Sequence, residues 1–210
     1  MPKAAASSLT GGTGDVNPQW LSAAAGVGQL QTGTSPGSSA SLSQQTQIPV
    51  PVPRFSVKDG KSIVMEVLKI VWAYGVDLPI NTDNSFELIL NGYLSTIQPQ
   101  PASAASSIAG TTVDYYSAAF TETQTNAIGV DFLETIPSDN PTFHDITDGA
   151  GHGVLVATDN VWLTLNATAT VFNSTQVTIP GATITARMLY RFKEVTLQEY
   201  IGIVQSQQSR

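Results

Sequence analysis

The stretch Phe86-Glu87-Leu88-Ile89-Leu90-Asn91 indicates the fold class of this chain. Its apolar residues at 86, 88 and 90 alternate with the polar Glu87 and Asn91. In a β-strand successive side chains point to opposite faces, so a period of two places one set of side chains on one face. The stretch therefore predicts a strand that buries one face of a sheet.

The segment before it, residues 62–72, is also predicted to be a strand. It contains five β-branched residues, which restrict χ1 in a helix and suit a pleated sheet. The breakers Gly75 and Pro79 follow the run. A helix is the alternative, because one helical face would hold Ile63, Val67, Ile70 and Tyr74.

The chain beyond residue 54 shows short apolar runs separated by Gly, Pro, Asn, Asp and Ser, a pattern typical of an all-β domain with many turns. Two long stretches, residues 98–110 and 137–153, are predicted to be surface loops that carry contacts. The further predicted strands bring the total to about eight. These strands cover residues 113–123, 128–136, 154–165, 169–172, 176–179 and 183–195.

The last predicted strand, residues 183–195, has one basic face and one apolar face. Directly after it, Thr196 and Glu199 have the spacing of a capping box, in which each side chain satisfies an unpaired amide at the start of a helix. A short helix is therefore expected over residues 197–205. Its apolar side, with the spacing to dock on the edge of the sheet, holds Leu197, Tyr200, Ile201 and Val204.

Residues 1–53 are predicted to be a flexible arm. They consist mainly of Ala, Ser, Gly, Thr, Gln and Pro, and their only charges are Lys3 and Asp15. Such a segment buries too little apolar surface to offset its conformational entropy. Prolines at 49, 51 and 53 favour an extended exit from the folded body. The chain is accordingly divided into an arm, 1–53, and a folded domain, 54–210.

The composition suits one domain with an appendage. Of the 210 residues 41% are hydrophobic, which is enough for a single core, and there is no cysteine for disulfides, thiolate metal sites or a cysteine nucleophile. We find no apolar signal-peptide core after Met1 and no run of about 18 apolar residues that would cross a bilayer. A soluble protein without a membrane partner is expected.

The charge of the chain bears on its partners. Only 12% of the residues are charged and the net charge is -7, so general phosphate binding is not predicted. The few cations are nevertheless grouped, and a group of this kind could contact nucleic acid or the interior of an assembly. Alternatively, they lie on solvated faces or pair with Glu66, Glu87 and Glu194. The six cations are Arg54, Lys58, Lys61, Arg187, Arg191 and Lys193.

No catalytic, cofactor or metal site is assigned. Two imidazoles and two carboxylates that could ligate a metal fall within nine residues, at His144, Asp145, Asp148 and His152. Their spacing matches no established site. Tight turns that need positive φ explain the segment more simply, because it also holds Gly149, Gly151 and Gly153. No serine elbow or phosphate loop occurs, and the protein is expected not to be an enzyme.

Residues 145–160 and 189–208, and to a lesser degree 65–69, resemble segments of coat proteins from environmental circular Rep-encoding single-stranded DNA viruses of the CRESS type. This resemblance implies a single jelly roll, with eight antiparallel strands in two sheets, that assembles into an icosahedral shell around a small genome. The loops 98–110 and 137–153 would form the outer surface. One departure is that such proteins usually carry an arginine-rich arm, whereas residues 1–53 sum to zero charge. The arm is therefore expected to act as a clamp between subunits.

The sequence thus predicts a viral capsid protein of the virion, assembled inside the host cell, whose partners are copies of itself and, through weak interior contacts, a single-stranded DNA genome. No cofactor is expected. The alternative is a non-enzymatic β-sandwich that serves as a binding module or as a filament or pilus-like surface subunit. Candidate interface anchors, which could equally belong to the core, are Trp20, Trp72, Trp162 and Tyr200.

Overall fold

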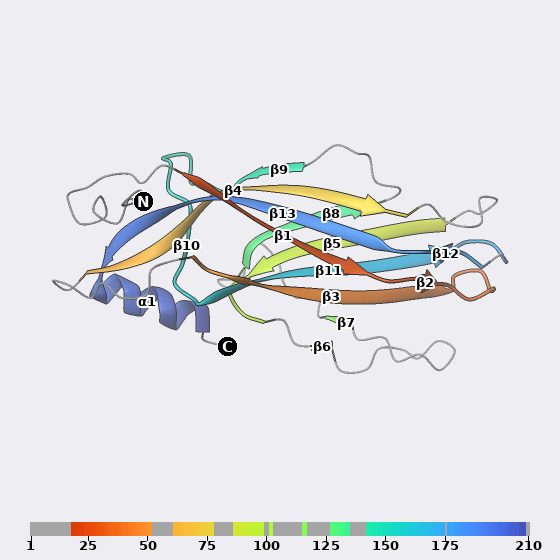
Figure 1. Cartoon of the computed structure of the whole chain (residues 1–210). Coiled ribbons are helices and arrows are strands. Elements are labelled where there is room, and N and C mark those ends of the chain that lie inside the picture. Colours follow the sequence, from red (N-terminus) through yellow and green to blue (C-terminus); the bar gives the residue numbers. More distant parts are fainter. Residues whose placement is uncertain are drawn as a thin grey trace, which may run out of the picture.

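Two antiparallel sheets and one helix make up the fold in the computed structural model of the chain (Figure 1). The first sheet has β4 (Lys61–Val76) and β13 (Ala182–Thr196) at its centre, where they pair along almost their whole length. β1 (Gln19–Val27) pairs with the free side of β13, and β9 (Thr142–Asp145) and β10 (Val154–Val156) pair with the free side of β4.

The second sheet has the order β3-β11-β5-β8. Its long central strand β11 (Asn160–Val171) pairs with β3 (Ser39–Pro49) on one side and with β5 (Phe86–Ser95) on the other. β8 (Ala127–Glu134) completes the sheet beside β5. Two short ribbons pair β2 (Leu30–Gln31) with β12 (Thr178–Ile179) and β6 (Pro101–Ala102) with β7 (Tyr115–Tyr116).

The structure describes eight stretches of the chain, and every statement about structure below concerns these stretches. They are residues 18–51, 61–77, 86–98, 101–102, 115–116, 127–134, 142–174 and 176–208.

The long strands pair in a nested order. The first strand, β1, pairs with the last, β13, and the second, β3, pairs with the second-last, β11. The third, β4, pairs with β9 and β10, and the fourth, β5, pairs with the next strand along the chain, β8. Nested antiparallel pairs divided between two facing sheets are the topology of a jelly roll. The predicted all-β single jelly roll is thereby confirmed, and the helical alternative for residues 62–72 is wrong.

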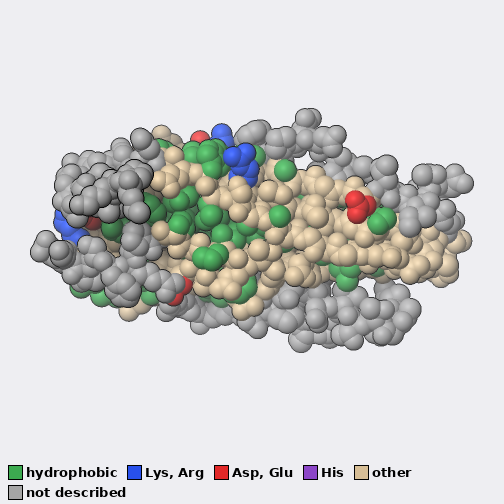
Figure 2. Space-filling view, viewed as in Figure 1, with side chains coloured by type: hydrophobic (Ala, Val, Ile, Leu, Met, Phe, Trp, Pro, Cys, Tyr) green, Lys and Arg blue, Asp and Glu red, His purple; other side chains and the backbone are tan. Residues whose placement is uncertain are grey.

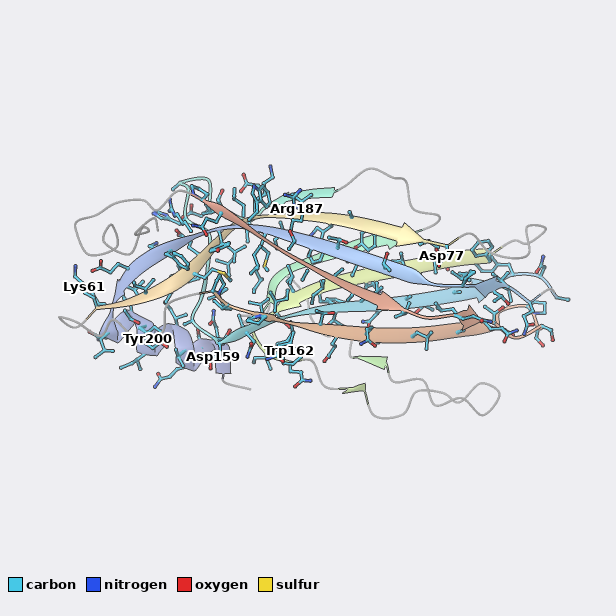
Figure 3. The ribbon with its side chains drawn as sticks, in the orientation of Figure 1. Lys61, Asp77, Asp159, Trp162, Arg187 and Tyr200 are labelled. Carbon is cyan, nitrogen blue, oxygen red and sulfur yellow. The ribbon has the colours of Figure 1, made fainter. Side chains whose placement is uncertain are left out.

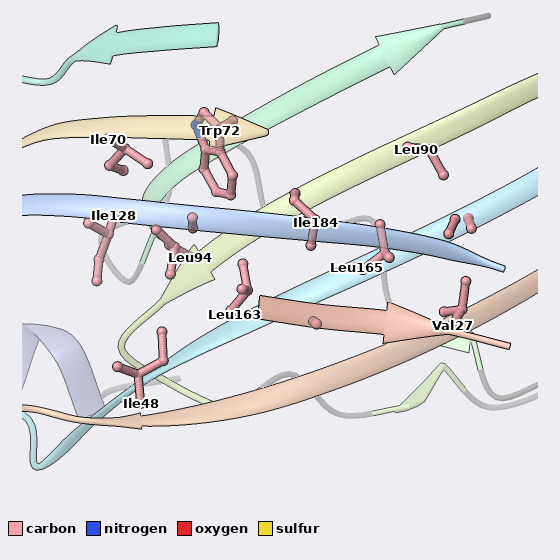
Figure 4. Packing of buried hydrophobic residues seen from close by; sticks show 14 of the residues in the cluster. Val27, Ile48, Ile70, Trp72, Leu90, Leu94, Ile128, Leu163, Leu165 and Ile184 are labelled. Atoms are coloured by element: carbon pink, nitrogen blue, oxygen red, sulfur yellow. The ribbon is translucent and has the colours of Figure 1, made fainter. Parts of the chain in front are cut away.

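The core lies between the two sheets and is filled by every second residue of their strands. In β13 the inward residues Ala182, Ile184, Ala186 and Met188 are all buried, and they join one cluster with residues of β11 and β5 (Figure 4). Trp72 is completely buried in this cluster. A Cβ at Gly92 would lie 3.1 Å from the ring of Trp72 and 2.1 Å from Ile184 Cδ1, so this glycine makes room for both side chains.

The structure corrects the predicted arm, because residues 18–51 contribute β1 to the first sheet and β3 to the second. The composition of residues 18–51 wrongly indicated a flexible segment. A segment rich in small and polar residues can still form strands when its backbone pairs with long strands that supply the apolar surface. Ala25 and Val27 face the core, and Thr46 Oγ1 donates a hydrogen bond of 2.8 Å to the Ala24 carbonyl. The boundary predicted at residue 53 therefore does not separate an arm from the fold. Residues 1–17 and 52–53 lie outside the described residues.

Several predicted strand boundaries also change. The run 154–165 is two strands, β10 and the start of β11, and the predicted strand 169–172 is the end of β11. The predicted loop 137–153 contains β9, which pairs with β4. The two main sheets hold nine described strands where about eight were predicted, and β1 and β3 were missing from the predicted set. Of the predicted strand 113–123 only residues 115–116 are described, and of the predicted loop 98–110 only 98 and 101–102.

The C-terminal helix α1 (Leu197–Gln208) begins as predicted and is longer than expected. Its capping box is formed, because the Thr196 amide donates to Glu199 Oε2 at 2.8 Å and the Glu199 amide donates to Thr196 Oγ1 at 3.2 Å. The predicted docking face is wrong in part, since Leu197 and Ile201 are exposed. Gln207 is buried instead.

Candidate assembly surface

A buried carboxylate joins the loop before β10 to the first sheet. Glu66 of β4 is fully buried, and its Oε2 accepts a hydrogen bond of 2.5 Å from Arg191 Nε. Its Oε1 accepts hydrogen bonds from Lys193 Nζ at 3.3 Å and from the Gly153 amide at 3.1 Å. Arg191 Nη2 also donates to the Gly151 carbonyl at 3.1 Å. We call these residues, Glu66, Gly151, Gly153, Arg191 and Lys193, the Glu66 cluster.

Burial by itself raises the pKa of Glu66, because it removes water from the charged form. The hydrogen bonds from Arg191, the Gly153 amide and Lys193, together with the charge of Lys193, outweigh this effect and hold the pKa below its ordinary value. Glu66 is therefore ionised at neutral pH. Arg191 and Lys193 both form structural ion pairs with Glu66.

The loop that the Glu66 cluster anchors is a series of turns closed by carboxylates. Asp145 Oδ1 accepts a hydrogen bond from the Thr147 amide, and Asp148 Oδ1 accepts from the Ala150 and His152 amides. Asp148 Oδ2 lies 2.9 Å from His152 Nδ1, and this contact, followed by the two amides, lowers the pKa of Asp148 to about 2. Asp145 and Asp148 therefore stabilise the turns of this loop by accepting hydrogen bonds from its backbone amides.

The glycines of this loop have two different roles. Gly149 and Gly151 have φ of 80° and 87°, so the predicted need for positive φ is confirmed for both. Gly153 does not have positive φ, which corrects the prediction for this residue. A Cβ on Gly153 would lie 2.0 Å from the Val67 carbonyl oxygen, so the glycine permits a close approach of two backbones. The side chain of His144 lies outside the described residues, and the described ones include no group of three or more potential metal ligands.

Most described cations of the predicted nucleic-acid set pair with acids. Lys61, labelled in Figure 3, has its Nζ 2.5 Å from Glu194 Oε1. Arg191 and Lys193 form ion pairs with Glu66. The alternative interpretation, pairing with Glu66 and Glu194, is thus confirmed for these three cations. Arg54 and Lys58 lie outside the described residues. A nucleic-acid contact by any of the six remains a prediction.

Arg187 differs from the other cations. Its guanidinium carbon lies 5.0 Å from the centre of the Trp20 ring, within the range of a cation–π contact, and both side chains are exposed on the outer face of the first sheet. Of the predicted anchors, Trp20 is 46% exposed and Trp72 is in the core. Trp162 and Tyr200 are half-buried. Sequence alone could not separate these aromatic residues, because strand register decides which face each one takes.

Helix α1 covers one end of the sandwich and leaves apolar side chains free. Gln207 fastens it, because its Nε2 donates to the Leu155 carbonyl and its Oε1 accepts from the Ala157 amide at 3.0 Å. Between the helix and β13 lies a shallow groove lined by Leu155, Val195, Ile203 and polar neighbours. In the described part of the chain no helix is long and apolar enough to span a bilayer.

The comparisons with known proteins rest on structure alone, since no protein-family model and no curated protein matches this sequence. The VP1 pentamer of human polyomavirus 6 is similar at 12% identity, over 85% of this chain and 95% of that one, with a TM-score of 0.50. Merkel cell polyomavirus VP1 in complex with 3'-sialyllactosamine is similar at 9% identity, over 88% and 98% of the two chains, with a TM-score of 0.52.

The strand order and this likeness define the class of the protein as a jelly-roll β-sandwich of the kind found in viral capsid proteins. At identities of 9% and 12% the likeness shows the fold alone.

Proposed function

We propose that this chain is a viral capsid protein, whose copies assemble into a closed shell, and that it acts without catalysis. The observation that carries the proposal is the nested strand order of the two sheets, which occurs in a fold similar to two VP1 capsid proteins over 85% and 88% of this chain. Fold does not determine function, so the surface of the molecule must also suit assembly.

The surface supports assembly. In the described part of the chain, four large hydrophobic side chains are exposed at three places, which suits a subunit with several neighbours: Trp20 in β1, Phe172 after β11, and the pair Leu197 and Ile201 on α1. The buried Glu66 and the turn aspartates Asp145 and Asp148 are held by structural hydrogen bonds.

The finer assignment follows the sequence resemblance. The shell is icosahedral, encloses a circular single-stranded DNA genome of the CRESS type and forms inside the host cell, so the protein resides in the virion. Because three of the described cations already pair with acids, contacts with the genome are few and weak. The closed shell therefore retains the genome mainly by enclosing it, and neutralisation of the phosphates by the protein contributes little.

The purified full-length chain tests the proposal. Size-exclusion chromatography with light scattering, followed by negative-stain microscopy, is expected to show closed particles of uniform size. Fibres would favour the filament subunit instead, and dispersed monomers across a range of salt and pH would overturn the proposal. Particles purified after nuclease treatment are expected to yield circular single-stranded DNA, and particles that consistently lack nucleic acid would overturn the finer assignment.

A further inference from the structure

The outer face of the first sheet is lined by small side chains and is almost without charge. Strand register places three rows side by side on it: Ser22, Ala24 and Gly26 of β1, Thr183 and Thr185 of β13, and Val71, Ala73 and Gly75 of β4. Most of these residues are exposed, and none is charged or larger than valine. The surface view in Figure 2 looks onto this region, which is mainly uncharged.

One cation and one anion stand at opposite ends of this face, which we call the β1-β13-β4 face. Arg187 stacks on Trp20 at one end, opposite Val71 of β4. Asp77 follows β4 at the other end, where its amide donates to the Gly181 carbonyl, and its Oδ2 lies 3.1 Å from the place that a Cβ on Gly181 would take (Figure 3). Six residue-to-residue steps of extended chain lead from Val71 to Asp77, a span of about 20 Å.

We propose that the β1-β13-β4 face packs on the same face of a second copy of this chain across a two-fold axis. The inference rests on the proposed function and adds a particular subunit contact to it. An axis that passes midway between Val71 and Asp77 brings Arg187 of each copy onto Asp77 of the other. A two-fold contact repeats every pair twice, so two ion pairs flank the axis.

The residues around the axis fit this packing. Sheets that stack face to face lie about 10 Å apart, and small side chains such as Ala73 and Thr185 leave room for an approach at least this close. Trp20 and Arg187 are the residue types most enriched among the energetically dominant residues of protein interfaces. Near the Arg187 end Lys69 of β4 lies opposite Asp145 of β9, so the charges of these two residues largely offset each other.

A second copy suits this face better than nucleic acid does. A groove for single strands needs cations along the path of the phosphates, whereas the middle of the β1-β13-β4 face has none among its described residues. The chain as a whole carries a net charge of -7, which repels a polyanion. One positive and one negative end on the same surface are complementary to a reversed copy of that surface.

Site-specific cross-linking tests the inference, because the chain has no cysteine of its own. Thr185→Cys places a thiol beside the proposed axis, and Gln47→Cys places one on an exposed position of β3 in the other sheet. With a short bismaleimide, Thr185→Cys is expected to give a covalent dimer and Gln47→Cys to give none. Ala73→Cys, the register partner of Thr185, serves as a second reporter should Thr185→Cys fold poorly.

Charge reversal in the Thr185→Cys background makes the test specific. Arg187→Glu and Asp77→Arg are each expected to lower the cross-linked fraction at least fivefold, and the double variant is expected to restore it. Equal cross-linking of all variants, no cross-linking at either reporter, or no rescue by the double variant would overturn the inference. It would also be overturned if Arg187→Glu abolished binding of a fluorescent oligodeoxynucleotide and left cross-linking unchanged.

Microscopy of the same samples separates this inference from the proposed function. Closed particles without cross-linking would overturn the two-fold contact and leave the capsid proposal standing. Cross-linked dimers that never form closed particles would support the contact and contradict the capsid proposal. Monomers without cross-links would contradict both.

Discussion

Among single residues, Glu66 connects three separate segments of the chain. It lies in β4, takes hydrogen bonds from two residues of β13, and holds the amide of Gly153 at the end of the turn series. A buried carboxylate is costly unless all its hydrogen bonds are made, and here three donors surround it. The conformation of the loop 146–153 and the ionisation of Glu66 therefore depend on each other.

Replacement of Glu66 by glutamine is expected to lower the free energy of unfolding by about 2–4 kcal/mol, because Arg191 and Lys193 lose their buried counter-charge. Urea denaturation of a non-assembling preparation, followed by tryptophan fluorescence, measures this change. Glu194→Gln is the matched control, since it removes an exposed ion pair with Lys61 and should cost less than about 1 kcal/mol. Equal effects of the two substitutions would show that Glu66 has no special role.

The pH dependence of stability should follow the lowered pKa of Glu66. A carboxylate with a lowered pKa in the folded state stabilises the protein above its unfolded-state value of 4.5, and the stabilisation is lost as the pH falls through the folded-state pKa. The stability difference between wild type and Glu66→Gln is therefore expected to be full at pH 7 and to shrink below about pH 4.5. Denaturation curves at several pH values measure it, and a constant difference down to pH 2 would contradict the assigned ionisation.

The sequence indicated some residues of the Glu66 cluster but not how they contact one another. The basic face of residues 183–195 was visible from its alternation, and Glu66 was named as one alternative partner. The register that sets Glu66 opposite Arg191 joins residues 125 positions apart, so it depends on strand pairing and on the bulge between Leu189 and Tyr190. The capping box of Thr196 and Glu199 was predictable because all of its atoms lie within four consecutive residues.

At the level of elements, the approach of β10 to β4 depends on a residue without a side chain. Gly153 lies where any Cβ would meet the Val67 carbonyl, and backbone cannot move aside as a flexible side chain can. The same residue donates its amide to Glu66. Residue 153 must therefore be a glycine for steric reasons, and its amide also stabilises the charge of Glu66.

Gly153→Ala is expected to destabilise the protein by about 2–4 kcal/mol, because the loop must shift and its hydrogen bond to Glu66 must lengthen. Gly28→Ala is the control, since nothing lies within 4 Å of its Cβ position and its φ is not positive. Thermal denaturation of both variants gives the comparison. A Gly153→Ala variant as stable as Gly28→Ala would contradict the described close approach.

The sequence predicted elements well where apolar periodicity was strong and poorly where it was weak. β5 and β13 alternate clearly and were found, whereas β1 and β3 are rich in Ala, Ser and Gln and resemble a disordered tail in composition. Their stability comes from pairing with β13 and β11, which are far away in sequence. No local pattern reveals such a partner.

In the whole molecule, the nested pairing makes the N-terminal strands indispensable. β1 covers one edge of β13, and β3 covers one edge of β11, so each lies at the margin of a different sheet (Figure 1). Without them two long edges and part of the core would be open to solvent. Unprotected edges of this kind are templates for aggregation.

Deletion of residues 1–50 is therefore expected to abolish folding, in contrast to the removal of a flexible arm. Circular dichroism should show loss of the cooperative thermal transition, and the product should aggregate. Deletion of residues 1–17 alone leaves every described strand in place and is expected to retain the transition. A folded, soluble chain that begins at residue 51 would contradict the assignment of β1 and β3 to the two sheets.

Cryo-electron microscopy of the purified, assembled protein tests the central claim most directly. We predict a closed shell in which every subunit is a sandwich with the strand orders β1-β13-β4-β10 and β3-β11-β5-β8. Subunits that form only open fibres, or a protein that remains monomeric under all conditions, would contradict the account.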